Sequence, residues 1–304
     1  METVSISIAS IGRPSLADTL HSLSRLPKTE DLKLDVLIAD DSRDGAATRL
    51  VESLDLNGLP VTCLPVASGN ISHARNALLD AAESDWIVFV DDDEWVEPDW
   101  LARMFAAQRD FQADVVIGPV LPAYPPDTPA WLVRANPLYK DWGHRGKRLD
   151  TGRGGNTLVR MRLIRELALR FDPAYGITGG EDTVFFAEAA SRGAVIVATD
   201  DAIIREHVPP ERLSPTIILR RAIRAGQSYG ILQQTHLPSA AARLLFLLDA
   251  AAKTGLAAFL SLMFRPIDRA RHFRMRQKLA RNLGKLRSAF DLPLPEVYKK
   301  PDRG

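Results

Sequence analysis

Along residues 1–118, short apolar runs alternate with segments in which apolar residues recur every three or four positions. Short apolar runs are typical of buried strands and predict strands at residues 36–39, 61–64, 86–90 and 115–117. Alternation of apolar with small polar residues predicts a further strand at residues 4–9. The helical spacing predicts helices at residues 16–26, 46–54, 72–83 and 98–109. Strands joined by crossover helices form a mostly parallel, twisted sheet with helices on both faces, so the pattern predicts an α/β fold.

The pattern changes at Pro119. Residues 119–157 are rich in Pro, Gly, Trp and Arg and show little periodicity, which predicts a long loop of the kind that is usually functional. Residues 158–169 and 181–191 then predict helices, and residues 195–198 predict a further strand. The chain after Pro215 reads as helical throughout, which predicts a C-terminal helical extension.

Charge and cysteine content narrow the class of protein. The formal net charge is +1, so no overall positive field favours nucleic acid as a partner. One cysteine excludes a disulfide within the chain. The first three residues, Met1-Glu2-Thr3, lack the basic and apolar regions of a signal peptide, so we expect a cytoplasmic location.

Three consecutive aspartates, Asp91, Asp92 and Asp93, follow the apolar run at residues 86–90. Ligands of open parallel sheets bind at the carboxyl ends of the strands. Neighbouring carboxylates repel each other, and a divalent cation removes that repulsion. Oxygen ligands favour Mg²⁺ or Mn²⁺, which fill their remaining positions with water and phosphate oxygens. The cluster therefore predicts a cation and a phosphate-bearing substrate, and the alternative is a solvated acidic turn before a helix.

A second acidic pair, Asp40-Asp41, follows the run at residues 36–39 and precedes Ser42. A carboxylate there can accept hydrogen bonds from a base or a ribose hydroxyl, whereas Asp41 or Ser42 could equally cap a helix. The loop after the first predicted strand is Ser10-Ile11-Gly12-Arg13-Pro14, not a Gly-x-Gly-x-x-Gly turn. That loop argues against a dinucleotide cofactor held on a glycine turn.

Taken together, these motifs resemble the family 2 inverting glycosyltransferases, which have the GT-A fold for nucleotide-diphospho-sugars. The resemblance covers about residues 1–210 and rests on ordered blocks, namely residues 4–14, Leu37 to Ser42, Gly69 to Asn76, Phe89 to Asp93 and Gly179 to Asp182. Residues 206–212, Glu-His-Val-Pro-Pro-Glu-Arg, are similar to bacterial exopolysaccharide (succinoglycan-type) members. The resemblance implies a GT-A catalytic domain over residues 1–212, with a nucleotide-sugar-binding half (1–118), an acceptor-binding half (119–212) and a helical extension (213–304).

The resemblance implies a UDP-sugar donor. Asp41 would bind the uracil, and the loop of Ser10, Ile11, Gly12 and Arg13 would line the same pocket. In many members a tyrosine or phenylalanine and an asparagine replace Ile11 and Gly12, so base stacking by this loop is open. Arg75 would lie near the nucleotide or brace the loop, or be a surface arginine of a helix.

Metal binding is also implied by the resemblance. Asp91 and Asp93 occupy the two acidic positions of the family's Asp-x-Asp motif. Asp93 would be the principal metal ligand, and Asp91 or Asp92 would face the ribose or a metal-bound water. His207 could be a third metal ligand or a diphosphate contact, although a lone histidine is more often structural.

Asp182 would be the catalytic base that deprotonates the acceptor hydroxyl. Gly179 and Gly180 would let the backbone approach a sugar, so Gly180 and Glu181 are candidate acceptor-binding residues. The alternative is that Glu181 and Asp182 only complement the dipole of the following helix. Trp131 and Trp142 are candidate platforms for the acceptor sugar, with core anchoring as the competing role.

The helical extension raises the question of a membrane. Residues 240–264 are strongly apolar, but the longest uncharged stretch, residues 254–264, is shorter than the ~20 residues that span a bilayer. The basic segment from Arg265 to Arg287 predicts either a peripheral contact with anionic lipid or a helix packed on the catalytic domain.

We therefore expect transfer of a single sugar to a saccharide or a lipid-linked saccharide in exopolysaccharide or cell-surface glycan synthesis. The chain lacks the Gln-x-x-Arg-Trp signature of processive synthases. The alternatives are a metal-dependent nucleotidyltransferase and a non-catalytic module that binds nucleotide-sugars or glycans.

Overall fold

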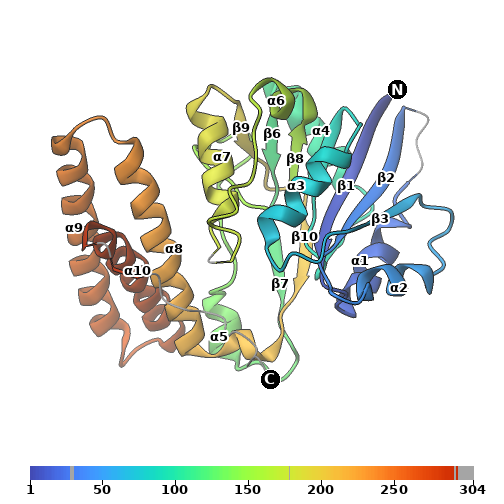
Figure 1. The fold of residues 1–304 in the computed structure, drawn as a ribbon. Helices are drawn as coiled ribbons and strands as arrows, with labels where there is room; N and C mark the ends of the chain where they lie inside the picture. The colour runs from blue at the N-terminus through green and yellow to red at the C-terminus, as the bar shows by residue number, and fades with distance from the viewer. Residues whose placement is uncertain (28–30, 178, 291, 294–304) are drawn as a thin grey trace. The chain divides into compact units, whose positions relative to one another are not determined.

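A computed structural model describes residues 1–27, 31–177, 179–290 and 292–293 of the protein (Figure 1). Contacts divide the chain into a sheet unit, Met1–Ala123 with Lys140–His207, and a helical unit, Tyr124–Tyr139 with the chain from Val208. The second segment of the helical unit begins at Val208, close to the expected boundary at residue 212. Residues 124–139, which were expected to belong to the catalytic domain, also group with the helical unit. The last part of the expected extension, residues 294–304, lies outside the described residues.

The sheet unit holds the strands and most of the shorter helices. Its strands are β1 (Glu2–Ser10), β2 (Leu32–Asp40), β3 (Val61–Pro65), β4 (Trp86–Phe89), β5 (Glu94–Val96), β6 (Val115–Ile117), β7 (Val120–Ala123), β8 (Thr157–Arg160), β9 (Ile196–Ala198) and β10 (Ile204–His207). Its helices are α1 (Ser15–Leu23), α2 (Ala46–Glu52), α3 (Ile71–Ala81), α4 (Trp100–Phe111), α6 (Met161–Glu166) and α7 (Glu181–Ser191).

The main sheet has seven strands in the order β3-β2-β1-β4-β8-β6-β9. Strand β8 runs antiparallel to β4 and β6, and the other pairings in this sheet are parallel. A smaller sheet has the order β5-β10-β7. The predicted mostly parallel α/β architecture is therefore confirmed.

Both faces of the main sheet are covered, as the apolar runs predict. In β4, Trp86 and Val88 belong to one core cluster, with α1 and α4, and Ile87 and Phe89 belong to a second cluster, with α3, α6 and α7. A strand that is buried on both faces needs apolar residues at consecutive positions rather than at alternate ones. The run at residues 86–90 is apolar throughout for this reason.

The prediction of a helix over residues 158–169 is wrong in its first part. Residues 157–160 form β8, and the helix α6 begins only at Met161. Strands β5 and β7 and helix α5 (Ala130–Ala135) were not predicted. The buried Asn156 fixes the start of β8, because its Nδ2 donates to the carbonyl oxygens of Pro119 (2.8 Å) and Ala202 (2.9 Å).

The helical unit contains α5 and the helical elements that follow β10. These are η1 (Pro210–Leu213), α8 (Pro215–His236), α9 (Ala240–Phe264), α10 (Arg269–Arg287) and η2 (Ser288–Phe290). Its core joins Leu132 and Ala135 of α5 to Ile218 of α8 and Phe273 of α10. These apolar contacts explain why residues 124–139 group with the helical unit.

Candidate active site

The carboxyl ends of β1, β2 and β4 meet at one edge of the main sheet, because the three strands are adjacent and parallel. Ser10, the last residue of β1, pairs with Asp40, the last residue of β2. The Ser10 hydroxyl donates to Asp92 Oδ2 (2.7 Å), and the Asp41 amide donates to the Ser10 carbonyl (2.8 Å). Three of the blocks predicted from the sequence therefore lie together.

The loop after β1 needs a glycine at its centre. Gly12 has a φ of +81°, and a Cβ at this position would lie 2.6 Å from the Cβ of Ala46 at the start of α2. Ile11, beside it, exposes 55% of its surface. Arg13 turns towards the aspartates, with Nη1 3.0 Å from Asp92 Oδ1 and 3.6 Å from Asp93 Oδ2. The loop thus offers an apolar side chain and a cation beside the acidic edge.

The two acids after β2 have different surroundings. Asp40 accepts hydrogen bonds from the backbone and hydroxyl groups of both Ser42 and Thr48. Burial raises the pKa of Asp40, but these hydrogen bonds outweigh it and hold the pKa below its ordinary value. The Ser42 hydroxyl accepts from the Ala46 amide at the start of α2 (2.7 Å). Asp40 and Ser42 therefore cap α2, and Asp41 takes no part in that cap.

Asp41 instead holds the loop before α3. Its Oδ1 accepts from the Ser68 amide (2.5 Å), the Ser68 hydroxyl (3.0 Å) and the Gly69 amide (3.0 Å). These contacts fix the direction of the Asp41 carboxylate at the edge of the sheet.

The three consecutive aspartates differ in exposure. The side chain of Asp91 is 41% exposed, whereas those of Asp92 and Asp93 are 6% and 10% exposed. Burial raises the pKa of Asp92, and Arg13 and the Ser10 hydroxyl offset only part of that rise. Both carboxylate oxygens of Asp92 are already engaged by these two residues. Asp91 and Asp93 are therefore better placed than Asp92 to meet a ligand.

Sequence reasoning missed a buried ion pair below Asp91. The side chain of Glu94 is 0% exposed, its Oε2 accepts from the Asp91 amide (2.9 Å), and its Oε1 accepts from Arg153 (3.1 Å). Burial and the nearby Asp91 raise the pKa of Glu94 well above its ordinary value, although Arg153 opposes the rise. A Cβ on Gly155 would lie 2.6 Å from Glu94 Oε1, so this glycine makes room for the pair.

A second buried ion pair joins α3 to the start of α7. Arg75 Nη1 donates to Glu181 Oε1 (2.6 Å), with 8% and 9% of the two side chains exposed, and Arg75 Nη2 lies 3.5 Å from Asp91 Oδ1. Burial lowers the pKa of Arg75, but Glu181, Asp91 and Asp182 outweigh it and raise the pKa. The guanidinium of Arg75 therefore stays charged and bridges the acidic edge and α7.

The glycine run at residues 154–155 completes the connection to Asp182. The Gly154 amide donates to Asp182 Oδ2 (3.1 Å), and the Thr183 amide donates to Oδ1 (2.6 Å). A Cβ on Gly154 would overlap the guanidinium of Arg75. Asp182 is thus held close to two guanidinium groups, because it raises the pKa of both Arg75 and Arg153. Both Glu181 and Asp182 lie in the first turn of α7, so their carboxylates also interact favourably with the helix dipole.

Helix α3 positions the segment that leads to α7. The Asn76 side chain donates to the carbonyl oxygen of Phe171 (2.8 Å) and accepts from its amide (2.9 Å). Asn70 caps α3 through the Ser72 amide and donates to the carbonyl oxygen of Pro173 (3.0 Å). The block from Gly69 to Asn76 therefore braces residues 171–173, in addition to supplying Arg75.

His207 lies near the acidic edge but does not complete a metal site. Its amide donates to the carbonyl oxygen of Asp93 (2.8 Å), while its ring lies 4.4 Å from that of Trp95 and its Nε2 lies 3.2 Å from Asp18 Oδ2. Among residues 1–27, 31–177, 179–290 and 292–293, no three His, Cys, Asp or Glu side chains are arranged to hold a metal ion. The expected ligand set of Asp91, Asp93 and His207 is therefore not assembled, because Asp91 faces Arg75 and His207 faces Asp18.

The charges at the edge nevertheless suit a hard cation. Six carboxylates (Asp91, Asp92, Asp93, Glu94, Glu181 and Asp182) lie with three guanidinium groups (Arg13, Arg75 and Arg153), which leaves a formal surplus of three negative charges. A divalent cation with oxygen ligands would reduce that surplus. Asp93 and the exposed Asp91 are the carboxylates that could hold it.

The two predicted tryptophan platforms lie in different surroundings. Trp142 is 6% exposed and belongs to a core cluster of the sheet unit, which favours core anchoring. Trp131 belongs to the helical unit, where its ring contacts Phe273 and lies under the guanidinium of Arg269. Both contacts favour an anchoring role for Trp131 as well.

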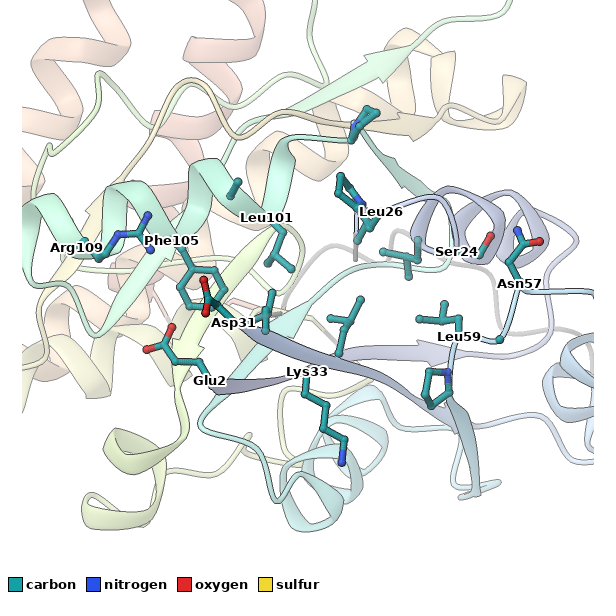
Figure 2. A pocket seen from close by; sticks show the side chains of 18 residues that line it. Glu2, Ser24, Leu26, Asp31, Lys33, Asn57, Leu59, Leu101, Phe105 and Arg109 are labelled. Carbon is teal, nitrogen blue, oxygen red and sulfur yellow. The ribbon is translucent and has the colours of Figure 1, made fainter. Parts of the chain in front are cut away.

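A cavity of about 500 Å³ lies elsewhere in the sheet unit. Figure 2 shows Leu26, Leu59, Leu101 and Phe105 in its wall, with Arg109 at one end. The residues that line it include none of the predicted site residues. The cavity is therefore separate from the acidic edge.

Comparisons with known proteins identify the family and the fold. The family model described as glycosyl transferase family 2 matches residues 5–170. The chain is 36% identical over 232 residues to the succinoglycan biosynthesis protein ExoM of Rhizobium meliloti, which covers 75% of this chain and 74% of that protein. It is 21% identical over 85 residues to the glycosyltransferase GlyA of Streptococcus pneumoniae, which covers 28% of this chain and 12% of that protein.

Solved structures show the same fold. The mannosyltransferase PcManGT from Pyrobaculum calidifontis, in complex with GDP-Man and Mn²⁺, matches with a TM-score of 0.60 and 18% identity over 95% of this chain and 87% of that one. S. aureus TarS 1–349 in complex with UDP matches with a TM-score of 0.54 and 18% identity over 95% and 91% of the two chains. The predicted GT-A fold is thus confirmed, and the chain belongs to glycosyl transferase family 2.

Proposed function

We propose that this glycosyltransferase moves one sugar from a UDP-sugar to a hydroxyl of a saccharide or lipid-linked saccharide, with inversion, in exopolysaccharide or cell-surface glycan synthesis. The observation that carries the proposal is the chain of contacts from Asp91 through Arg75 and Glu181 to the neighbouring Asp182. These contacts hold the partly exposed carboxylate of Asp182 close to the acidic edge of the sheet. Family membership disfavours the nucleotidyltransferase and the non-catalytic module considered above.

The relatives support the choice of donor and pathway. The name of the 36% identical relative places that protein in succinoglycan biosynthesis. TarS has been solved with UDP and with UDP-GlcNAc, whereas PcManGT has been solved with GDP-Man. In this chain we assign the uracil to Asp41 and the Ser10-to-Arg13 loop. Ile11 would contact the base through its exposed side chain.

The diphosphate would lie at the acidic edge. Asp93, with Asp91, would hold Mg²⁺ or Mn²⁺, which supplies positive charge to the leaving diphosphate. Arg13 is 47% exposed and can turn from Asp92 towards a phosphate oxygen. Asp92 would keep its bond to Ser10 and fix the end of β1, in addition to facing the ribose.

Asp182 would accept the proton of the acceptor hydroxyl as that oxygen attacks the anomeric carbon. Its Oδ1 and Oδ2 accept from the Thr183 and Gly154 amides, which orient the carboxylate. A positioned base of this kind contributes about 10²–10⁴-fold to the rate. Gly180 would allow the acceptor to approach. Glu181 would position Asp182 through Arg75 without contacting the acceptor.

The direct test is release of UDP by the full chain from a panel of UDP-sugars, with GDP-Man as the comparison donor, in Mn²⁺, Mg²⁺ or EDTA. We expect release from a UDP-sugar that depends on the cation and on an acceptor. Asp93→Asn should lower the rate at least about tenfold, because loss even of a group that only supports a metal ligand typically costs about 10–100-fold in metal affinity or activity. Asp99→Asn is the matched control, because Asp99 is exposed and pairs with Arg103.

Three results would contradict parts of the proposal. Turnover of GDP-Man in preference to every UDP-sugar would reject the donor. Equal rates in Mn²⁺ and EDTA would reject the cation. A product whose new anomeric centre keeps the configuration of the donor, seen in the coupling constant of its anomeric proton by NMR, would reject inversion.

A further inference from the structure

Helix α9 carries an exposed apolar face within the helical unit. Seven large side chains along it are between 51% and 67% exposed, namely Leu244, Leu245, Leu248, Leu256, Phe259, Leu262 and Met263. With 3.6 residues per turn, these positions fall in a sector of about 120° around the helix, and the sequence places no charged residue in that sector. We call these seven residues the α9 face.

The opposite side of α9 packs inside the helical unit. Ala250, Ala257 and Ser261 are buried there, and the Ser261 hydroxyl lies 3.1 Å from His272 Nδ1 of α10. The small buried residues account for the packing of α9 on its neighbour. The α9 face is therefore not needed for the core of the helical unit, and a continuous exposed apolar surface of this kind marks an interaction site.

Positive charge is concentrated in the same part of the chain. Residues 240–287 contain eleven Lys or Arg and two Asp or Glu, a net charge of +9, whereas the whole chain has a net charge of +1. Arg243 and Arg265 are exposed near the two ends of α9, and one of the two acids, Asp249, pairs with Lys253 (2.6 Å). Long arginine side chains near the ends of an apolar helix can reach anionic headgroups while their stems remain on apolar surface.

From these observations we infer that α9 binds in the plane of an anionic lipid surface, with the α9 face buried in the headgroup and acyl boundary. A second copy of the chain is a poorer partner. Antiparallel pairing of two α9 faces would bring Arg243 of one copy near Arg265 of the other, and parallel pairing would also set like charges together. An anionic bilayer instead complements these cations, and it needs no specific polar contacts from the apolar side chains.

The inference bears on two expectations from the sequence. By length and composition α9 is able to cross a membrane, although its longest uncharged stretch suggested otherwise. One side of α9 packs through small residues inside the helical unit, and charged residues flank the helix. Both features favour a helix that lies in the plane of the membrane over one that spans it. For Arg265 to Arg287 the sequence left a lipid contact and a packed helix as alternatives, and in α10 Phe273 and Ala280 are buried. The exposed apolar face thus belongs to α9.

Flotation of the full chain with vesicles tests the inference. One set of vesicles contains phosphatidylcholine alone. In the other set, about a third of the lipid is the anionic phosphatidylglycerol. We expect binding to the anionic vesicles that weakens but persists at high salt. The double variant Leu245→Glu with Phe259→Glu should bind at least about tenfold more weakly, because it places two charges in the apolar boundary.

Lys33→Glu is the matched control, because it changes the net charge by the same two units at an exposed residue of β2 in the sheet unit. It should bind the vesicles as the parent does. Circular dichroism of each variant establishes that it is folded. The test needs no turnover, so its result is independent of the proposed donor and acceptor.

Three outcomes would overturn the inference. The first is a folded parent that does not float with anionic vesicles. The second is equal binding by the parent and the double variant. The third is a parent that resists carbonate extraction, which would make α9 a spanning helix. If the parent fails to float but forms a dimer that the double variant abolishes, the α9 face binds a second copy instead.

Discussion

At the scale of single residues, the candidate site depends on small residues that admit large charged ones. Gly154 is the clearest case, because it lies against Arg75 and donates its amide to Asp182. Gly155 lies in the same way against the carboxylate of Glu94, where a Cβ would not fit. The two glycines let two buried ion pairs fit below the exposed Asp91.

Gly154→Ala should therefore both destabilise the protein and lower the rate. The new methyl group must displace the Arg75 guanidinium, and overpacking of this kind costs about 1–3 kcal/mol in the free energy of unfolding. Displacement of Arg75 also disturbs Glu181 and Asp182, so kcat should fall. Chemical denaturation and turnover measure the two effects. Gly255→Ala is the control, because nothing lies within 4 Å of its Cβ position, and alanine there should stabilise α9. Equal stability of the two variants would contradict the close approach.

Glu94 should make stability fall as pH rises. Its pKa is well above the ordinary 4.5 in the folded protein, so the folded state binds more protons than the unfolded state between these two values. The contribution of protonated Glu94 to the free energy of unfolding is fully present below the ordinary pKa. It is lost as the pH rises through the pKa of Glu94 in the folded protein. Glu94→Gln cannot ionise, so the melting temperature of the variant relative to the parent should increase as the pH rises above 4.5. Parallel melting curves over that range would contradict the shifted pKa.

Residues that directly follow buried strands could be predicted from the sequence, and their contacts could not. Asp91 to Asp93 and Asp41 reach one edge, because adjacent parallel strands end there. The partner of Glu181 was missed, because Arg75 lies over a hundred positions away. Arg153 was missed, because it lies in a stretch without periodicity, and no local pattern indicates an ion pair with Glu94.

At the scale of elements, α3 does more than bury an apolar side against the sheet. Its asparagines and serine hold residues 171–173, from which the chain proceeds to Glu181 and Asp182. The position of the proposed base thus depends on hydrogen bonds between α3 and a loop.

Asn76→Ala should loosen this loop. The change leaves the amide and carbonyl groups of Phe171 without the side chain that they bind, and an unpaired buried polar group costs about 1–3 kcal/mol. We expect lower stability, together with a fall in kcat that exceeds the change in UDP affinity. Asn282→Ala is the control, because Asn282 donates only to Lys278 on the exposed side of α10. A full kcat for Asn76→Ala would show that the loop does not position Asp182.

The elements predicted correctly are those whose pattern is local. Strands β1, β2, β3, β4 and β6 were found in this way, because each has a short apolar or alternating pattern of its own, whereas β5 was missed. Strand β8 was taken for a helix, because the apolar residues of Thr157–Arg160 and Met161–Glu166 form one stretch. The ladder that makes β8 a strand comes from β4 and β6, which are distant in the sequence. Helix α5 was hidden for a similar reason, since its apolar partners lie on α8 and α10.

At the scale of the whole molecule, the chain combines a sheet unit that carries the acidic edge with a helical unit that has a net charge of +12, from 19 Lys or Arg and 7 Asp or Glu. Composition alone hides this separation, because the net charge is +1. The separation supports the two proposals independently. In these two proposals the sheet unit supplies the chemistry, and the α9 face of the helical unit supplies attachment to lipid.

The central claim is that Asp182 takes the proton of the acceptor at a site whose nucleotide is held by other residues. The most direct measurement compares Asp182→Asn with the parent in single-turnover transfer and in UDP binding, with the exposed Asp200→Asn as control. The account predicts that Asp182→Asn slows transfer by about 10²–10⁴-fold and leaves UDP affinity unchanged, while Asp200→Asn alters neither. Transfer by Asp182→Asn at the rate of the parent would contradict it.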